Sequence, residues 1–318
     1  MTVAKREFPA MGTTCSVSVY GSGDSGRRGR TLEWLATLGE QRVMLLEALW
    51  SRFRQDSELS RLRAFAGQAA MSVSKETETL VRAMQSAWQV TGGAFDPTVL
   101  DAVKVVGYDR DFAEVIAADC IAAPSVFHGS IPGMSEVAVG ERSVSLPMGV
   151  SLDPGAIGKG LAADMVVEEL LLAGAHGVIV DLGGDIALGG VPGTDSMWSI
   201  GVSDERSPGR QPATARRHVS WKPGIGHAAI ATSTTLKRRW ADSRHHIVDP
   251  RTGSSTDETI VQATIAGARA WECEAWATAV LVRPSLLEVL PRGMTALVLA
   301  PNEVLRDDFS HDSETKVA

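Results

Sequence analysis

The sequence predicts an α+β fold, and two observations support this prediction. Short stretches of alternating apolar and polar residues, which are typical of strands, occur near the N-terminus and again in the C-terminal half. These stretches do not alternate regularly with helical ones, as they would in a doubly wound parallel sheet. The chain of 318 residues contains no internal repeat and no low-complexity linker, so we expect a single domain over residues 1–318.

The N-terminal third is predicted to contain one strand and three helices. Residues 13–20 alternate apolar and polar side chains, several of them β-branched, and predict the strand. Residues 31–54 carry apolar side chains at roughly helical spacing. A capping pattern opens a second helix in residues 56–67, and residues 75–91 predict a third helix that ends at a glycine pair.

The middle of the chain is predicted to hold short strands and one long helix. Strand-like runs occur around residues 137–139 and 143–146, within an otherwise mixed stretch. A glycine-rich turn precedes the helix, which we expect over about residues 159–173. An apolar strand, a glycine turn and a second short strand follow in residues 177–190.

The C-terminal third is predicted to contain more strands and a last helix. Residues 228–240 and 245–250 have the pattern of two arms of a hairpin-like unit. Residues 263–282 predict a strand that leads into a helix, and residues 294–308 predict a closing pair of strands. The polar tail, residues 310–318, is expected to be frayed, which leaves a core of about residues 8–300.

Composition and charge exclude several classes of protein. Hydrophobic residues make up 44% and charged residues 22% of the chain, as in an ordinary globular protein. The formal charge of −7 provides no basic surface, so nucleic acid is not an expected partner. The three cysteines, Cys15, Cys120 and Cys273, form no CxxC pair and are expected to be reduced thiols. The N-terminus lacks an apolar leader and no stretch offers ~18 apolar residues in a row, so we expect a cytoplasmic protein without a membrane span.

A glycine-rich turn before a helix, SLDPGAIGKGLAAD (151–164), could bind an anion. Glycine lets a ligand approach the main chain, the helix N-terminus offers unpaired N–H groups, and Lys159 adds positive charge. The pattern matches neither GxxxxGK[ST] nor GxGxxG. Taken alone, the stretch is more typical of a turn that caps a helix.

Two other stretches combine aspartates with turns. In DLGGDIALGG (181–190), Asp181 and Asp185 flank a glycine pair, for which a structural hairpin turn or bulge is the favoured interpretation. A ligand could also approach the main chain there. In TGGAFDPTV (91–99), Asp96 precedes a proline and either caps the next element or accepts hydrogen bonds from a polar ligand edge.

Glu274 and Thr278 lie four residues apart in a predicted helix, so their oxygens share one face. A carboxylate and a hydroxyl are hard ligands that suit Mg²⁺ rather than zinc. The alternative interpretation is a solvated glutamate near the start of a helix.

Two adjacent histidines open the stretch HHIVDPRTG (245–253). His246 has the chemistry of a general base for a hydroxyl group, because its usual pKa lies near neutrality. If the segment is a strand, His245 points to the opposite face and cannot serve the same site. Asp249, directly before a proline, is expected to shape the turn.

The order of these stretches along the chain is more informative than any one of them. Between about residue 8 and about residue 300 the chain contains, in this order, AMGTT, SRFRQDSELSRL, TGGAFDPTV, LDPGAIGKGLAAD, VDLGGDIALGG, AIATSTT, HHIVDPRTG and CEAWATAV. The ordered set resembles the ApbE family of flavin transferases, the FAD:protein FMN transferases. HIVDPRTG and LDPGAIGKG are the most specific of these blocks.

The resemblance implies a T-fold-like α+β architecture with mixed or antiparallel sheets packed by helices. It implies an enzyme that binds FAD and Mg²⁺, cleaves the FAD pyrophosphate, attaches FMN by a phosphoester bond to a threonine or serine of a target flavoprotein, and releases AMP. Some members of the family instead hydrolyse FAD to FMN and AMP. A flavin-binding protein without catalytic activity is a third hypothesis.

The resemblance also implies roles for individual residues. His246 matches the catalytic histidine. The residues that match FAD contacts are Met11, Ala94, Phe95, Asp96, Asp153, Lys159 and Val248. The residues that match metal ligands are Glu274, Ala277, Thr278 and Ala156, the last through its main-chain oxygen.

The chain departs from the family pattern at several positions, which motivate the hypothesis without catalysis. Glu274 stands where aspartate is usual and reaches one methylene further toward the metal. Thr234 replaces the glycine of a TSG turn, and Arg63 replaces an asparagine that is frequent near the flavin. Phe53 replaces a frequent tyrosine, so it keeps a stacking face without the hydroxyl.

Overall fold

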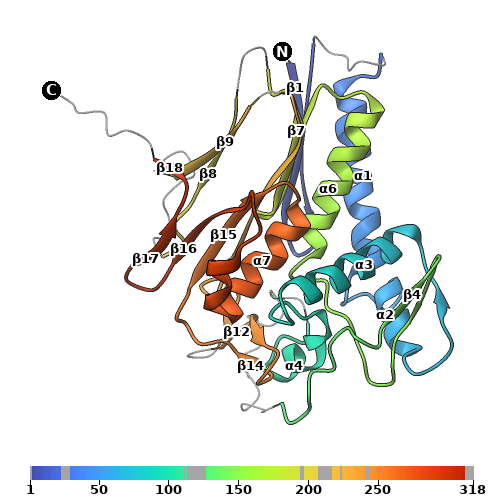
Figure 1. Cartoon of the computed structure of the whole chain (residues 1–318). Coiled ribbons are helices and arrows are strands. Elements are labelled where there is room, and N and C mark those ends of the chain that lie inside the picture. The colour runs from blue at the N-terminus through green and yellow to red at the C-terminus, as the bar shows by residue number, and fades with distance from the viewer. Residues whose placement is uncertain are drawn as a thin grey trace.

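One large sheet crosses the molecule, and helices cover one of its faces (Figure 1). The computed structural model describes residues 2–22, 29–110, 112, 127–193, 197–206, 217–222, 224–240 and 244–311. The sheet has eight strands, each antiparallel to its neighbours, so the predicted α+β class with antiparallel sheets is confirmed. In spatial order the strands are β1 (Thr2–Ala10), β2 (Thr13–Gly21), β6 (Gly177–Leu182), β7 (Ile186–Gly190), β10 (Ile225–Thr234), β15 (Gln262–Gly267), β16 (Thr295–Leu299) and β17 (Val304–Asp307).

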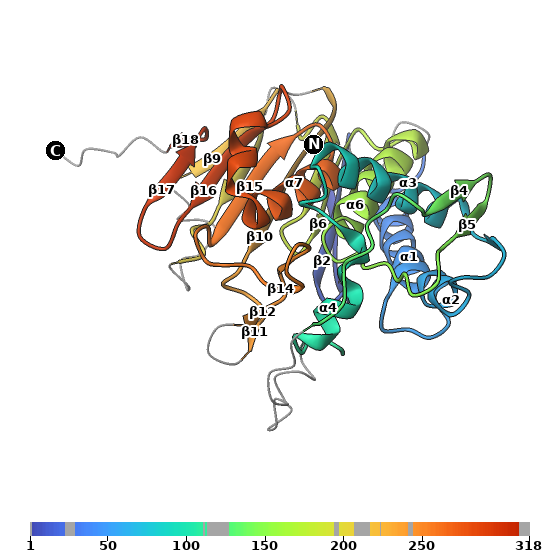
Figure 2. The ribbon, with the colours of Figure 1, turned by 60° about the horizontal axis from the view of Figure 1, so that its bottom comes forward.

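Three helices pack against one face of this sheet, as Figure 2 shows from a second direction. They are α1 (Leu32–Trp50), α6 (Gly158–Ala173) and α7 (Ala270–Val282). Helix α1 lies against β1 and β2, α6 against β6 and β7, and α7 against β10 and β15. Strand residues on this side, such as Val17, Val180 and Ile265, are fully buried. This apolar layer is the main core, and it holds α6 and α7 against the sheet.

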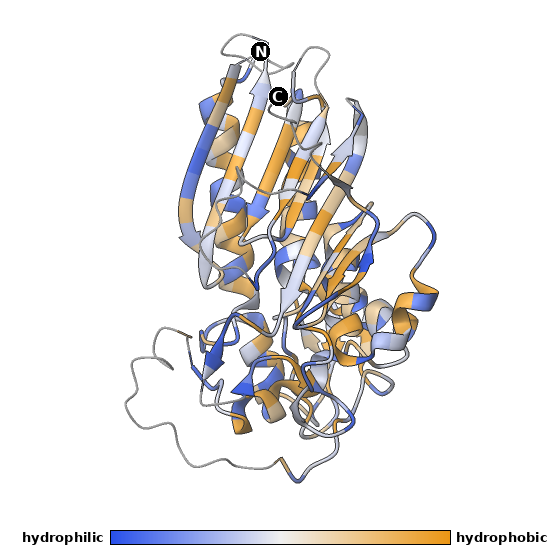
Figure 3. Cartoon of the chain, turned by 90° about the vertical axis from the view of Figure 1, so that its left-hand side faces the viewer, coloured by the Kyte–Doolittle hydropathy of each residue, from blue (hydrophilic) through white to orange (hydrophobic). Residues whose placement is uncertain are grey.

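A three-stranded sheet lies over part of the other face, the face toward the viewer in Figure 3. It consists of β8 (Trp198–Val202), β9 (Arg217–Trp221) and β18 (Ser310–His311), in the order β18–β9–β8. Trp198 packs with Leu188 of β7, and Val202 packs with Ile230 of β10. Side chains at every second position of β8 therefore attach the small sheet to the large one.

Short elements close the lower end of the large sheet (Figure 1). The helices and 3-10 turns there are α2 (Glu58–Ala64), α3 (Lys75–Val90), η1 (Pro97–Val99), α4 (Leu100–Val105) and η3 (Pro284–Val289). The strands are β3 (Met71–Ser72), β4 (Ala138–Gly140), β5 (Ser143–Ser145), β11 (Arg239–Trp240), β12 (Arg244–His245), β13 (Val248–Asp249) and β14 (Ser254–Ser255).

Most predicted elements are confirmed, with ends shifted by a few residues: β2, α1, α2, α3, α6, β6, β7, α7, β16 and β17. The hairpin expected from residues 228–240 and 245–250 is wrong in its larger part, because β10 pairs with β7 and β15 in the large sheet. Only Arg239 and Trp240 pair with the second arm, at Arg244 and His245. A ten-residue central strand buries more main chain than a free hairpin arm would.

The two ends and the cysteines complete the description. Residues 310–311 form β18, whereas residues 312–318 of the tail expected to be frayed lie outside the described residues. Cys15 and Cys273 are buried free thiols, and Cys120 lies outside the described residues. No helix in the described part of the chain is both long enough and apolar enough to cross a bilayer.

Candidate active site

A cavity of about 1070 Å³ lies where the start of α6, the end of α1 and the large sheet meet. Its lining includes the predicted site residues Met11, Ala94, Phe95, Asp96, Asp153, Ala156, Lys159, His246, Val248, Glu274 and Thr278. The remaining one, Ala277, is fully buried in α7 and does not line the cavity, so its role as a ligand stays a prediction. Segments that are far apart in the sequence therefore meet in one place.

Lys159, Asp185 and Glu274 form a buried charged group that we call the cavity cluster. Nζ of Lys159 donates to the Asp185 carboxylate and, over 2.5 Å, to Oε1 of Glu274. The main-chain N–H of Gly160 donates to Oε2 of Glu274 over 2.8 Å. Burial alone would lower the pKa of Lys159, but the charges of Asp185 and Glu274 outweigh burial and hold this pKa above its usual range. The ammonium group therefore stays charged at neutral pH.

Asp185 lines the cavity, although the sequence favours a structural turn for its segment and leaves a ligand approach there as the alternative. It directly precedes β7, and its carboxylate lines the cavity beside Lys159. The side chain is 4% exposed, and its Oδ1 has no hydrogen-bond partner among the described residues. A buried carboxylate oxygen without a partner is unusual in a folded protein and indicates a missing donor or cation.

The cavity cluster and its neighbours offer the oxygen ligands that a hard cation prefers. Thr278 lies one turn beyond Glu274 on α7, and its Oγ1 lies 2.8 Å from Oγ of Ser233. Burial raises the pKa of Glu274 above its usual range, and the charge of Lys159 opposes this rise. No group of three or more His, Cys, Asp or Glu that could hold a metal is found in the described part of the chain. Hydroxyl and main-chain oxygens, together with water and substrate oxygens, are the further ligands that a hard cation accepts.

His246 lies between β12 and β13 and borders the cavity. Burial lowers its pKa well below the usual value, and the charges of Arg238, Lys159 and Arg52 lower it further. Its Nδ1 is buried and has no hydrogen-bond partner among the described residues. The imidazole is therefore neutral at neutral pH and can accept a proton.

His245 faces a different environment, although it is the preceding residue. Its Nε2 lies 3.2 Å from the carbonyl oxygen of Thr256, and its Nδ1 accepts a hydrogen bond from the main-chain N–H of Ile247. The side chain is fully buried and is not part of the cavity lining. As expected, the two histidines do not share one site, although His246 lies in a bend rather than in a strand.

Phe53, Tyr108, His246 and the guanidinium group of Arg52 form one wall of the cavity, and Trp240 packs behind Tyr108. Tyr108 contacts the rings of Phe53, Trp240 and His246, with centroid distances of 6.2, 5.8 and 6.4 Å. The guanidinium carbon of Arg52 lies 4.7 Å from the Phe53 centroid and 4.2 Å from the Tyr108 centroid. We call this group the aromatic wall; a flat heterocyclic ring would stack well against it. Of its members, the sequence singled out only Phe53 and His246.

Asp96 and Asp153 hold turns as well as lining the cavity. Oδ1 of Asp96 accepts hydrogen bonds from the N–H and hydroxyl of Thr98, over 2.8 and 2.6 Å, so the capping interpretation is correct. Burial raises the pKa of Asp96. Oδ1 of Asp153 accepts from the N–H of Gly155 over 2.9 Å, and its Oδ2 lies 3.4 Å from Nη1 of Arg52. Their contacts with a ligand remain predictions.

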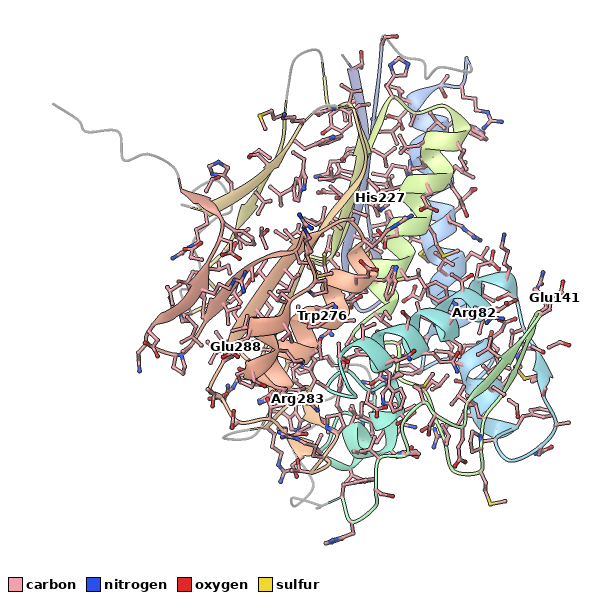
Figure 4. All side chains as sticks on the ribbon, viewed as in Figure 1. Arg82, Glu141, His227, Trp276, Arg283 and Glu288 are labelled. Atoms are coloured by element: carbon pink, nitrogen blue, oxygen red, sulfur yellow. The ribbon has the colours of Figure 1, made fainter. Side chains whose placement is uncertain are left out.

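A second buried charged group, which we call the closed cluster, joins α6 to the start of α7. Oδ1 of Asp164 lies 2.6 Å from Nε2 of His227 and accepts from the N–H of Ala270 over 2.9 Å. Oδ2 accepts from the N–H of Trp271 over 3.2 Å. Burial raises the pKa of Asp164 to about 7 and lowers that of His227 to about 4. None of these residues lines the cavity, and Figure 4 shows His227 beside α6.

The two clusters are separated by one close contact between helices. An added Cβ at Gly160 of α6 would lie 2.5 Å from the carbonyl carbon and oxygen of Ala270. Only glycine permits this approach, which brings Glu274 within reach of the Gly160 N–H.

Comparisons with known proteins agree with the sequence resemblance. The sequence profile of the ApbE family matches residues 11–297. A protein of Treponema pallidum named FAD:protein FMN transferase is 31% identical, over 93% of this chain and 84% of its own length. A Vibrio cholerae protein of the same name is 26% identical, over 86% of this chain and 79% of its own length.

Solved structures show the same fold. The ApbE protein of Thermotoga maritima superposes with a TM-score of 0.79 at 23% identity, covering 96% of this chain and 97% of the other. The flavin transferase ApbE of Vibrio cholerae superposes with a TM-score of 0.71 at 21% identity, covering 97% of each chain.

Proposed function

The chain belongs to the ApbE family, and from this membership we propose that it is an Mg²⁺-dependent FAD:protein FMN transferase. In this reaction the FAD pyrophosphate is cleaved, FMN becomes attached to a threonine or serine hydroxyl of a target flavoprotein, and AMP leaves. The observation that carries the proposal is that one cavity joins a ring-binding wall, a buried lysine–carboxylate cluster and a neutral histidine. These parts match a flavin ring, a pyrophosphate and an acceptor hydroxyl.

The proton transfer is assigned to His246. A threonine hydroxyl is a weak nucleophile until a base removes its proton, and a neutral imidazole can do so. The hydroxyl oxygen forms a bond to the phosphorus of the FMN moiety. The bond from that phosphorus to the bridging oxygen breaks, and the electron pair leaves with AMP. The imidazolium that forms then loses this proton to solvent, in keeping with the lowered pKa of His246.

We assign the neutralisation of the negative charge on the phosphates to the cavity cluster. Lys159 supplies a fixed positive charge in the first turn of α6, and the N-terminus of a helix favours a bound anion. Glu274, Thr278 and the main-chain oxygen of Ala156 would hold Mg²⁺, with Asp185 close enough to keep Lys159 in position. Bound there, Mg²⁺ would neutralise charge on the phosphate oxygens and so stabilise the departure of AMP.

A second candidate function uses the same groups with water as the acceptor. Hydrolysis of FAD to FMN and AMP needs the phosphate site and a base but no partner protein. His246 borders a large cavity in which a water molecule could take the place of the acceptor hydroxyl. The two reactions differ in whether AMP release requires an acceptor.

The test is to incubate the purified protein with FAD, Mg²⁺ and a set of candidate flavoproteins. Mass spectrometry of the acceptor should show the mass increment of FMN, accompanied by one AMP for each FMN transferred. AMP release at the same rate without an acceptor would favour the hydrolase. Tight FAD binding with neither AMP nor modified acceptor would favour a flavin-binding protein without catalysis.

A further inference from the structure

The cavity continues beyond the cavity cluster along the uncovered part of the large sheet. Its floor there includes Lys5 of β1, Ser16 and Ser18 of β2, and Ile179 and Asp181 of β6. These residues are cross-strand neighbours, because Ser16 pairs with Asp181 and Ser18 with Ile179. They point away from the helices, since the alternate residues Val17 and Val180 are buried in the core below α1 and α6. We call this floor and the bordering strand β8 the sheet groove.

The side of the sheet groove is the free edge of β8. This strand pairs with β9 on one side, and no other strand among the described residues pairs with it. Residues 199–202 of β8, which alternate in the direction of their side chains, all line the cavity, as does Ser203. The main chain of β8, and not only one of its faces, therefore borders the cavity. An edge of this kind offers unpaired N–H and C=O groups to an added strand.

Two details determine how much of this edge is available for pairing with an added strand. Beyond β8, the carbonyl oxygen of Ser203 accepts a hydrogen bond from Nε2 of Gln262 over 2.9 Å, so it is already used. The strand itself has five residues, a length of roughly 16 Å. An added segment of about four to six residues would pair fully with it.

The groove leads directly to the phosphate site. Asp181 ends its floor, and the glycine pair that follows leads to Asp185 of the cavity cluster. The aromatic wall belongs to other elements, at the end of α1 and around residues 108, 240 and 246. The floor residues include no aromatic ring that could stack on a flavin or an adenine. The short side chains of Ser16 and Ser18 instead leave room for a peptide main chain.

We propose that the sheet groove binds an extended segment of the acceptor protein, which adds as a strand to the free edge of β8. The segment would bring its threonine or serine hydroxyl to the phosphate site from the side that the FAD rings do not occupy. Main-chain hydrogen bonds would give affinity, and the short floor residues would favour small side chains beside the acceptor residue. This inference rests on the proposed transferase function, because it assigns a place to the acceptor of that reaction.

The test uses a library of blocked decapeptides with one central threonine and Ala, Gly, Ser or Val at the other positions. The full-length protein, FAD and Mg²⁺ are added, and mass spectrometry detects peptides that carry FMN. The best peptide is then remade with N-methyl groups at alternate residues, in two complementary sets. Strand addition uses the N–H groups of one set only, so one set should reduce transfer at least tenfold and the other should not.

A variant pair tests the same surface from the enzyme. Ser16→Tyr fills the floor and should lower transfer to the peptide at least tenfold relative to FAD affinity, which flavin fluorescence measures. Val304→Tyr is the matched control, because Val304 is exposed on β17 at the opposite end of the large sheet. A peptide whose central threonine is replaced by valine cannot accept FMN but can still bind. When this peptide is added, amide hydrogen exchange of the enzyme should show new protection in β8 and none in β17.

The outcomes separate the two proposals. If neither N-methyl set nor Ser16→Tyr changes the rate of FMN transfer to the peptide, the proposal that the sheet groove binds the acceptor is wrong, while the transferase function stands. AMP release and modification of a whole flavoprotein, without transfer to any peptide or protection of β8, also overturns it. Absence of AMP and of FMN transfer to any acceptor instead contradicts the proposed function itself.

Discussion

The same pair of helices carries two buried charged clusters that differ in how completely their polar atoms are paired. In the closed cluster, both carboxylate oxygens of Asp164 have partners: His227 and the first N–H groups of α7. In the cavity cluster, Oδ1 of Asp185 has none among the described residues, and Lys159 is shared between two carboxylates. The carboxylate of the closed cluster is therefore fully paired, although Nδ1 of His227 has no partner among the described residues, whereas the carboxylate of Asp185 still lacks a donor or a cation.

The pairing of its oxygens therefore indicates whether a buried carboxylate has a structural or a ligand-binding role. A fully paired buried carboxylate stabilises the helix end that it caps. An incompletely paired one costs free energy in the empty protein and recovers it when a ligand binds. Each cluster also has a nearby histidine with an unpartnered Nδ1 in the described structure, His227 and His246, so these residues form a matched pair for experiments.

The largest expected effect comes from replacing each of these two histidines, in separate variants, by glutamine. His246→Gln should lower kcat for FMN transfer by about 10²–10⁴-fold, because it removes the proposed base. His227→Gln should leave kcat within about threefold, because His227 lies outside the cavity. AMP release at saturating FAD measures both. Equal losses in the two variants would mean that the comparison of the clusters says nothing about catalysis.

A smaller effect is expected on metal binding. Glu274→Gln keeps the shape of the side chain but removes its charge, so the affinity for Mn²⁺ should fall at least tenfold, about 1.4 kcal/mol. Electron paramagnetic resonance of free Mn²⁺ measures this affinity without any turnover. Asp164→Asn makes the same chemical change in the closed cluster and is the control, with unchanged Mn²⁺ affinity expected. Loss of affinity in both variants would indicate a structural rather than a ligand role for Glu274.

A third effect concerns stability and its dependence on pH rather than catalysis. The raised pKa of Asp164, about 7, makes the folded state more stable as pH falls from 7 toward 4. The lowered pKa of His227, about 4, makes the folded state less stable as pH falls below 6.5, so the two groups offset each other. His227→Gln removes the destabilising titration of His227. As the pH falls from 6.5 to 4, the unfolding free energy of this variant should therefore rise relative to that of the wild type, by up to about 1.4 kcal/mol per pH unit. Urea unfolding at several pH values measures the difference; a difference independent of pH would show that His227 does not titrate as assigned.

The sequence predicts the parts of the fold that have a strong local pattern. Helices α1, α3 and α6 follow from their spacing of apolar residues, and β2 follows from its alternation. Strands β1, β8 and β9 have no such signal. Charged residues follow one another in β1, which lies at the edge of the sheet. Strand β9 contains several polar residues, and its side chains are half-buried. Their positions depend on partners elsewhere in the chain, which no local pattern contains.

The same limit applies to the site. Lys159, Glu274 and His246 could be predicted because their own chemistry and their sequence blocks indicate a role. Asp185 and Arg52 could not, because their roles come from neighbours far away in the sequence. Arg52 contacts Asp153, 101 residues later, and Asp185 becomes part of a cluster only when α6 and α7 meet it. An aspartate after a glycine pair has the same local pattern whether it ends a turn or lines a cavity.

The contact between Gly160 and Ala270 determines more than the packing of two helices. Because Glu274 bonds to the N–H of Gly160 and Asp164 bonds to the N–H of Ala270, both clusters depend on one interhelical distance. A single methyl group at position 160 would change this distance for both at once. Ligand affinity and thermal stability would then vary together, and selection for either property would constrain the other at this position.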